Sequence, residues 1–254
     1  MSNLDISPTQ PTHAPEPANP AASTTPSTMP HPKSLTLILA ATPSLGIGRA
    51  GQLPWPQLRK EMGYFARVTS RVSPASIAPG DGAGELAQKK KRMNAVVMGR
   101  KTWESIPERY RPLKGRVNVV VTRSVDAFKR QLSPKEGGQE DVGEGPIVVG
   151  SVGDALSCLH SDKVKAEVDR VMVIGGASIY EQALRLKEAR HVLLTKIQEE
   201  YECDTFFSED LNGSEWKKAS EQELKDFTGE DFKDGVQVEE KGVKFEFCLY
   251  NRVD

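Results

Sequence analysis

A single carboxylate stands on an otherwise apolar stripe of the segment 57–69. Leu58, Met62 and Phe65 fall at positions i, i+4 and i+7, which is the spacing of one face of an amphipathic helix. Glu61 lies inside that stripe at i+3. Two interpretations stay open: a border carboxylate that reaches out to solvent, or a buried acid in an apolar pocket. Burial would raise the pKa of this carboxyl group and would require a charged or hydrogen-bonding partner.

Two junctions between a predicted strand and a predicted helix have the features of an anion site. They are Gly99-Arg100-Lys101-Thr102 and Gly175-Gly176-Ala177-Ser178. Each would place free backbone N–H groups at a helix start, where the helix dipole favours negative charge. Arg123 ends a strand that could lie beside the first junction. One such junction is usually a packing feature, whereas two junctions with three cations favour an extended phosphate ligand.

The segment 46–51 matches the dinucleotide fingerprint G-x-G-x-x-G and follows a predicted strand. In that fingerprint the last glycine opens a helix whose N-terminus holds a pyrophosphate. Here Pro54 and Pro56 come next, and proline is not tolerated inside a helix. We therefore expect a glycine-rich loop with positive φ angles, which could still close over a bound cofactor.

Alternating strands and helices must position these residues. Short apolar runs predict strands at 35–41, 95–98, 116–122, 147–149, 170–174, 191–197 and 203–207. Helices are predicted at 57–69, briefly after the first glycine junction, at about 151–160 with Ser151 and Asp154 as its cap, and from about Ser178. Alternation at 243–249, with 236–238, predicts a closing antiparallel hairpin. The expected fold is a single α/β domain with a central mixed, mainly parallel sheet flanked by helices. Ligands of such sheets bind beyond the carboxyl ends of the strands.

Composition limits the function classes. The chain has 34 basic and 35 acidic residues, a balance that indicates neither nucleic acid nor a membrane surface as partner. The three cysteines and four histidines are scattered, so we expect no disulfide framework and no metal site. No apolar run reaches the roughly 18 residues of a membrane span, and no G-x-S-x-G elbow supports nucleophilic catalysis.

The expected folded domain spans 35–254, and two segments are expected to lie outside its core: a tail that precedes it and an insertion on its surface. Residues 1–34 carry eight of the 17 prolines and predict a disordered tail, because they cannot bury enough apolar surface to offset their ordering entropy. The tail has no apolar signal core and is poor in basic residues, so we expect a cytoplasmic protein, with nuclear access left open. Residues 71–92 predict a surface insertion, whose basic run 89–92 either solubilises it or acts as a nuclear-import signal.

Several short motifs follow one another along the chain: Leu45-Gly46-Ile47-Gly48, Leu53-Pro54-Trp55-Pro56, Met98-Gly99-Arg100-Lys101-Thr102-Trp103, Ser105-Ile106-Pro107, Arg111-Pro112-Leu113-Lys114-Gly115-Arg116, Ile174-Gly175-Gly176 and Asp204-Thr205-Phe206-Phe207. In this order they resemble dihydrofolate reductase, in its longer eukaryotic form of fungal type with an N-terminal extension. The resemblance covers about residues 35 to 251.

The resemblance implies roles on the substrate side. Glu61 would bind the amino group and a ring nitrogen of the pteridine, Thr195 would hydrogen-bond that carboxylate, and Trp55 would hold an ordered water beside it. Arg111 would bind the α-carboxylate of the substrate's glutamate tail, as a bidentate guanidinium can. The other substrate-binding residues would be Ile38, Ala40, Leu53, Met62, Phe65, Ile106, Leu113, Ile174 and Tyr180.

The resemblance also implies NADPH as cofactor. The nicotinamide side would be flanked by Ala40, Ile47, Gly48 and Gly51; phosphates would be held by Gly99, Arg100, Lys101 and Thr102; the adenosine 2′-phosphate by Thr122, Arg123 and Ser124; and the pyrophosphate by Gly175, Gly176, Ala177, Ser178 and Ile179. Gly175 and Gly176 would be joined by a cis peptide. Two positions depart from the family pattern: Met62 stands where eukaryotic relatives often have Phe, and Gly150 where some have an Arg near the adenine ribose.

The implied reaction is hydride transfer from NADPH to 7,8-dihydrofolate, giving 5,6,7,8-tetrahydrofolate for one-carbon and thymidylate metabolism. The protein would stack the two rings and exclude water, and Glu61 would tune the electrostatics of the pterin while a water carries the proton. The alternatives are a related pyrimidine reductase and a non-catalytic folate-binding scaffold. We expect a monomer that binds dihydrofolate and antifolate inhibitors but neither nucleic acid nor membrane.

Overall fold

The computed structural model describes residues 1, 34–73, 91–132, 145–161, 164–233 and 235–253. Almost all of the predicted tail and most of the predicted insertion therefore lie outside the described residues.

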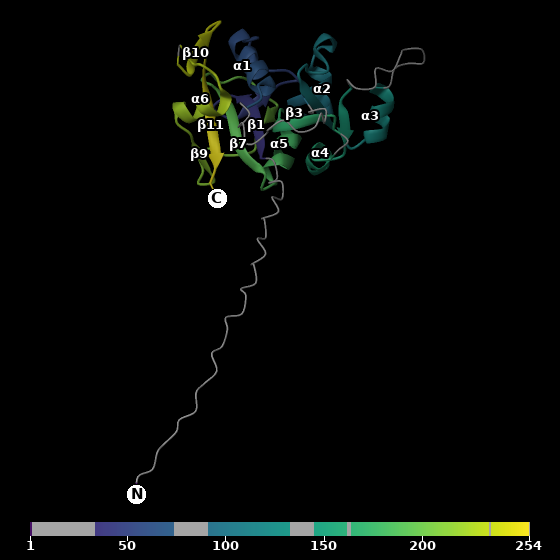
Figure 1. Ribbon diagram of the computed structural model, residues 1–254. Coiled ribbons are helices and arrows are strands. Elements are labelled where there is room, and N and C mark those ends of the chain that lie inside the picture. The colour runs from purple at the N-terminus through teal and green to yellow at the C-terminus, as the bar shows by residue number, and fades with distance from the viewer. Residues whose placement is uncertain (2–33, 74–90, 133–144, 162–163, 234, 254) are drawn as a thin grey trace. The chain divides into compact units, whose positions relative to one another are not determined.

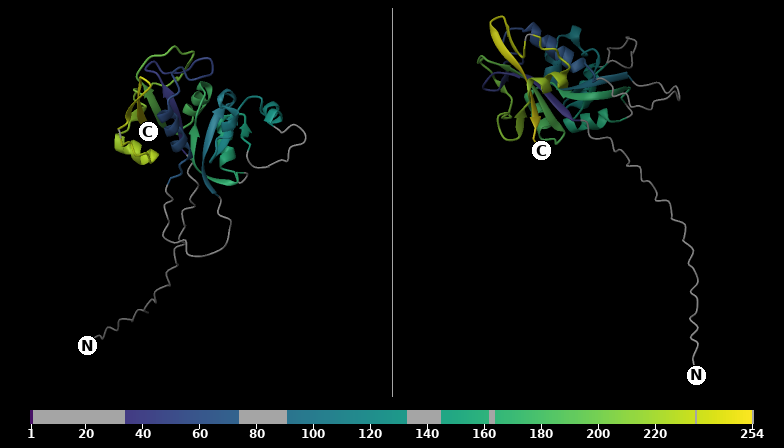
Figure 2. Two further views of the ribbon diagram at one scale, coloured as in Figure 1. Left: turned by 90° about the horizontal axis from the view of Figure 1, so that it is seen from above. Right: turned by 60° about the vertical axis from the view of Figure 1, so that its left-hand side comes forward.

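A mixed sheet forms the centre of the domain, with the strand order β10-β11-β7-β1-β6-β3-β4-β5 and with β9 beside β11 (Figure 1). Six strands run parallel: β1 (Leu35–Ala41), β3 (Lys91–Gly99), β4 (Arg116–Val121), β5 (Ile147–Val149), β6 (Ala166–Val173) and β7 (Ala189–Ile197). Three join antiparallel: β9 (Trp216–Lys218), β10 (Gln237–Glu240) and β11 (Val243–Arg252). Figure 2 shows these C-terminal strands at one edge of the sheet and α3 (Val125–Leu132) beyond the other. The predicted mixed, mainly parallel sheet is confirmed.

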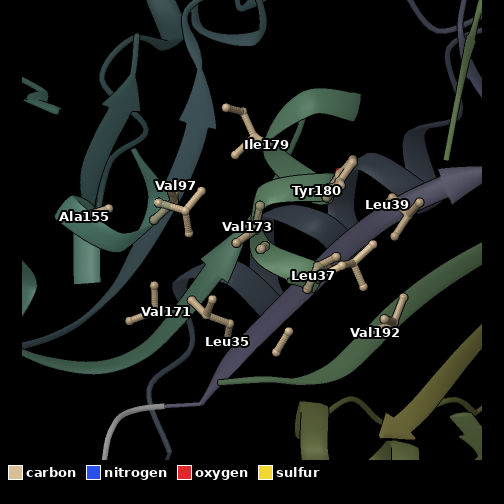
Figure 3. Close-up of a cluster of buried hydrophobic side chains, with 14 of the residues drawn as sticks. Leu35, Leu37, Leu39, Val97, Ala155, Val171, Val173, Ile179, Tyr180 and Val192 are labelled. Carbon is tan, nitrogen blue, oxygen red and sulfur yellow. The ribbon is translucent and has the colours of Figure 1, made fainter. Parts of the chain in front are cut away.

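Side-chain alternation along the strands divides the core between the two faces of the sheet. Leu35, Leu37 and Leu39 of β1 point to one face, where they pack with α4 (Val152–Leu159) and α5 (Ala177–Leu184) (Figure 3). Ile38 points to the other face, which is covered by α1 (Arg59–Ser70), α2 (Arg100–Ser105), α3 and α6 (Glu221–Thr228). Both faces are covered, which explains why the parallel strands are continuous apolar runs.

Two predicted strands begin earlier than expected. The strand expected at 95–98 starts at Lys91, and the strand expected at 170–174 starts at Ala166, because the two pair in parallel from Lys91 opposite Ala166. Arg92 therefore belongs to the sheet, where it forms an ion pair with Asp169 and donates to the Ser73 carbonyl. This end of the basic run has a structural role in addition to any role in solubility.

Other elements differ from the prediction. The strand expected at 203–207 is reduced to β8 (Thr205–Phe206), which pairs with β2 (Gly46–Gly48) in a separate two-stranded sheet. The helices α3 and α6 were not predicted. The start of α6 is a capping box, in which Ser220 Oγ accepts from the Glu223 N–H and the Glu223 carboxylate accepts from the Ser220 N–H.

Candidate active site

Glu61 lies in the first turn of α1 with its carboxyl group turned into the protein. Thr195 on β7, which is only 2% exposed, donates from Oγ1 to Glu61 Oε1 over 3.4 Å. Burial raises the pKa of Glu61 to about 7, and the hydrogen bond from Thr195 offsets this only in part. The buried-acid interpretation therefore holds, and the partner of the carboxyl group is a hydroxyl rather than a cation.

Two more predicted site residues, Trp55 and Ala40, belong to or pack against the same side of the core as this helix. Trp55 is buried, yet its indole N–H has no hydrogen-bond partner among the described residues. A buried donor of this kind is rare in folded proteins and is typical of a site that binds water or ligand. Ala40 lies directly opposite Thr195 in the pairing of β1 with β7, so it is next to the residue that hydrogen-bonds Glu61.

A second feature of α1 is a stripe formed by Glu61, Phe65 and Thr69, at positions i, i+4 and i+8 of one side of the helix. A rise of 1.5 Å per residue separates its two ends by about 12 Å. At the far end, Arg116 at the start of β4 donates from Nη1 to Thr69 Oγ1 over 2.6 Å and from Nε to the Lys114 carbonyl over 3.0 Å. Burial lowers the pKa of Arg116, and no acid pairs with it in the described part of the chain. The stripe thus has the buried carboxyl group of Glu61 at one end and, at the other end, the guanidinium of Arg116, which no acid neutralises among the described residues.

Arg111, the arginine expected at the substrate tail, is not among the described contacts of this stripe. It lines a surface cavity of about 570 Å³ whose walls come from α2, α3 and the short 3-10 helix η1 (Glu108–Tyr110), with none from α1. Its guanidinium lies over the ring of Trp103, 5.6 Å from the ring centre, and 3.5 Å from Glu108. The guanidinium that hydrogen-bonds the α1 stripe is therefore that of Arg116 and not that of Arg111. The sequence itself indicated how far this stripe extends, because Thr69 stands at the helical spacing that continues from Glu61 through Phe65, about two turns further along α1.

The two glycine junctions are joined to each other. The Gly99 N–H donates to the Gly175 carbonyl over 2.7 Å, and Gly175 and Gly176 are joined by a cis peptide bond, as the resemblance implies. Gly175 has a φ of +113°, a region that favours glycine. A Cβ at Gly99 would lie 3.0 Å from Ile179 Cγ1, and one at Gly176 would lie 3.5 Å from Thr102 Oγ1. These glycines therefore let the starts of α2 and α5 approach each other closely.

The remaining residues of the expected substrate pocket differ in exposure. Ile38, Ile174 and Tyr180 are buried, and the Tyr180 hydroxyl donates to the Ile38 carbonyl over 2.7 Å. Phe65, Ile106 and Leu113 are half-buried. By contrast, Leu53 is 53% exposed and Met62 is 44% exposed. These two are apolar side chains available to a ligand.

The glycine-rich loop differs from its prediction in one respect. Gly46 and Gly48 are part of β2, and the positive φ angles occur at Leu45, Ala50 and Gly51. Glycine at position 46 has a packing reason, since a Cβ there would lie 2.4 Å from Cys203 Sγ. As expected, no helix starts at the loop.

The loop is tied to the segment that carries β8. Arg49 forms an ion pair with Glu202 at 2.9 Å, and the Ala50 N–H donates to Asp204 Oδ2 over 2.7 Å. Ile47, in β2 just before these residues, is half-buried.

The expected phosphate-binding cations gather at one edge of the sheet. Arg100 and Lys101 follow β3, and Arg123 follows β4, its parallel neighbour. All three side chains are exposed, and the one ion pair that they form among the described residues joins Arg100 to Glu104 at 3.9 Å. The carboxyl ends of β3, β4 and β6 and the starts of α2 and α5 thus form one anion-favouring edge.

Among the described residues, no group of three or more His, Cys, Asp or Glu side chains could hold a metal ion, and the three cysteines are free thiols. In the same residues, no helix is long and apolar enough to cross a membrane.

Comparison with known proteins assigns the family. The model of the dihydrofolate reductase family matches residues 86–241. Dihydrofolate reductase of Pneumocystis carinii is 37% identical over 227 residues, covering 87% of this chain and 97% of that protein, and the Rattus norvegicus protein is 34% identical with 87% and 99% covered. A solved structure of Schistosoma mansoni dihydrofolate reductase aligns with a TM-score of 0.60 and 31% identity over 86% of this chain and 98% of that one. Fold and relatives together define an oxidoreductase. The chain belongs to the dihydrofolate reductase family.

Proposed function

We propose that this chain uses NADPH to reduce 7,8-dihydrofolate to 5,6,7,8-tetrahydrofolate, with Glu61 as the group that binds and polarises the pterin. The observation that carries the proposal is the lone carboxyl group of Glu61, buried at the start of α1 with Thr195 as its partner. A carboxylate accepts two hydrogen bonds side by side, which matches the adjacent amino and ring N–H groups of a pterin. Its pKa, raised to about 7 by burial, leaves a substantial fraction of the carboxyl group protonated near neutral pH in the ligand-free protein.

The α1 stripe supports a binding direction for the substrate. With the pterin at Glu61, the benzoyl group would lie along Phe65 and the tail carboxylate would reach Arg116. The separation of about 12 Å along the helix suits a pteroylglutamate in an extended form. Arg116 is the better candidate for the tail than Arg111, because its partners are neutral oxygens whereas Arg111 already faces Glu108. Thr69 would then act as a positioning residue that holds the guanidinium in place.

The chain offers a site that fits the implied cofactor. The cradle between Gly99 and Gly176, which side chains at either position would narrow, suits a pyrophosphate against two helix starts. We propose that Gly99, Arg100, Lys101 and Thr102, together with Gly175 to Ile179, hold the phosphates. When bound, NADPH supplies the hydride. The protein's part is to orient the two rings and to exclude water from between them, for which the tethered loop with Ile47, Gly48 and Gly51 is suitably placed in sequence beside Ala40.

The pterin ring nitrogen beside the hydride acceptor must gain a proton. Glu61 is proposed to act on this step through the electrostatics of the ring, and water is proposed to carry the proton. Trp55, whose buried N–H has no described partner, is the residue proposed to hold such a water near the pterin.

The test of this function is steady-state turnover of purified Glu61→Gln. We expect cofactor binding to persist and turnover to fall by about a hundredfold or more at neutral pH, as is typical for loss of a group active in proton chemistry. Glu167→Gln is the matched control, because Glu167 is an exposed acid of β6 and the substitution changes the net charge equally. Near-normal turnover of Glu61→Gln would contradict the role given to Glu61.

A further inference from the structure

The end of the proposed cofactor site that would meet the adenine ribose is formed by two neighbouring strand ends. Val121 of β4 lies opposite Val149 of β5, and just beyond them the Thr122 N–H donates to the Val149 carbonyl over 2.9 Å. The segment Thr122-Arg123-Ser124 therefore lies beside Gly150 and the start of α4.

The start of α4 brings an acid to this place. Asp154 stands in the first turn of α4, and its backbone N–H donates to Ser151 Oγ over 3.0 Å. Its carboxylate lies directly against Gly150, since a Cβ at position 150 would be 3.1 Å from Asp154 Oδ2. In the described part of the chain, Asp154 forms no ion pair with a cation, and Arg123 forms no ion pair with an acid. The place thus holds the Arg123 guanidinium, the Asp154 carboxylate beside Gly150, and a second exposed acid, Asp126, in the first turn of α3.

This charge balance is not the one that a ribose phosphate prefers. In nucleotide sites generally, an acid near the ribose favours the free 2′-hydroxyl of NAD, and arginine favours the 2′-phosphate of NADP. We propose that Asp154 is a specificity-determining residue that lowers the preference of this site for NADPH over NADH, and that Arg123 alone carries the preference that remains. The proposal rests on the proposed function, in which Thr122, Arg123 and Ser124 meet the 2′-phosphate.

The effect of Asp154 is large enough to measure. A phosphate monoester carries nearly two negative charges at neutral pH. As an order of magnitude from Coulomb's law, a unit charge placed roughly 8 Å from a dianion in a water-like dielectric changes the binding constant of the dianion by about fivefold before screening by salt. Ordinary salt reduces this effect, because the Debye length at about 0.15 M is also about 8 Å. A ligand with a bare 2′-hydroxyl is not repelled by Asp154 in this way, so Asp154→Asn should not change its binding constant through this effect.

The experiment is calorimetric titration of the full chain with two fragments that differ only in the 2′-phosphate, adenosine 2′,5′-bisphosphate and adenosine 5′-monophosphate, at low salt. The variants are Asp154→Asn and Arg123→Ala, with Glu167→Gln as the control of equal charge change, near the amino end of β6 and so at the opposite edge of the sheet from the strands' carboxyl ends. We expect Asp154→Asn to raise the ratio of the two binding constants by about three- to fivefold. Arg123→Ala should lower the ratio at least tenfold, as for loss of a charge-assisted contact. Glu167→Gln should leave the ratio unchanged.

The outcomes separate the two claims. If Asp154→Asn behaves like Glu167→Gln while Arg123→Ala lowers the ratio, the role of Asp154 is wrong and the phosphate site is right. If neither Arg123→Ala nor Asp154→Asn alters the ratio, the 2′-phosphate is bound elsewhere and both claims are overturned. A ratio that rises at low salt and returns to the starting value at high salt supports a direct charge effect of Asp154.

Discussion

Replacing Glu61 with Gln should change how the stability of the protein depends on pH. The carboxyl group has an ordinary pKa of 4.5 in the unfolded chain, and burial raises it to about 7 in the folded protein. Between these values the folded state holds a proton that the unfolded state has lost. The free energy of unfolding therefore falls as the pH rises through this window, and the loss is complete above about pH 7.

The size of the effect follows from the two pKa values. Over the range from pH 5 to pH 8, ionisation of Glu61 should lower the free energy of unfolding by about 2.5 kcal/mol. Glutamine does not titrate, so Glu61→Gln should lack this loss. For a domain of this size the difference corresponds to about 5–10 °C in melting temperature at pH 8 relative to pH 5. A constant offset from the hydrogen bonds of the new amide does not matter, because the prediction concerns the change with pH.

The assay is urea unfolding followed by tryptophan fluorescence at several pH values from 5 to 8, on the ligand-free protein, for the parent, Glu61→Gln and Glu167→Gln. The difference in unfolding free energy between Glu61→Gln and the parent should grow steadily with pH, and that of the control should not. If the difference in unfolding free energy between Glu61→Gln and the parent stays constant within roughly 0.5 kcal/mol from pH 5 to pH 8, the conclusion that burial raises the pKa of Glu61 is refuted.

Three further predictions follow from the same structure. Arg116→Leu should raise the KM for dihydrofolate at least tenfold, and Arg111→Leu should raise it less than threefold. The two variants should have the same KM for a dihydropterin that lacks the glutamate tail. A larger effect of Arg111→Leu on the KM for dihydrofolate would show that Arg111 binds the tail. Gly99→Ala should lower the free energy of unfolding by about 1–3 kcal/mol through its contact with Ile179, and this cost should be smaller when Gly99→Ala is made in a chain that already carries Ile179→Ala; an unchanged urea midpoint of Gly99→Ala would show that the glycine junction is not tightly packed. Deletion of residues 1–32 should leave turnover and melting temperature almost unchanged, because their composition predicts no packed contacts; a large fall in melting temperature would show that they dock on the domain.

The sheet was predictable because its strands are short apolar runs that pack on both faces. β1 and β7 were predicted almost to the residue, since helices cover both sides of them. The early start of β3 at Lys91 was not predictable from periodicity, because its first residues are polar and depend on pairing with β6 and on the ion pair of Arg92 with Asp169. The helix α6 was missed although Ser220 and Glu223 have the spacing of a capping box.

The candidate site was predictable in its chemistry and less so in its geometry. The lone Glu61 on an apolar stripe and the two glycine junctions stood out from spacing alone. From the sequence, only Arg111 was expected at the substrate tail. Arg116 begins β4, and its hydrogen bond to Thr69 depends on the fold and could not be read from spacing. The positive φ angles of the glycine-rich loop also depend on its pairing with β8, which places two of them at Leu45 and Ala50 rather than at glycine.

The most direct test of the central claim is transfer of the hydride itself. Purified protein would be given 7,8-dihydrofolate and NADPH that carries deuterium at the reactive position of its nicotinamide, and the products would be analysed by mass spectrometry. The account predicts that reduced cofactor is consumed and that tetrahydrofolate appears with one deuterium, and that Glu61→Gln suppresses both. Consumption of NADPH without labelled tetrahydrofolate, or binding of dihydrofolate with no reduction, would contradict it.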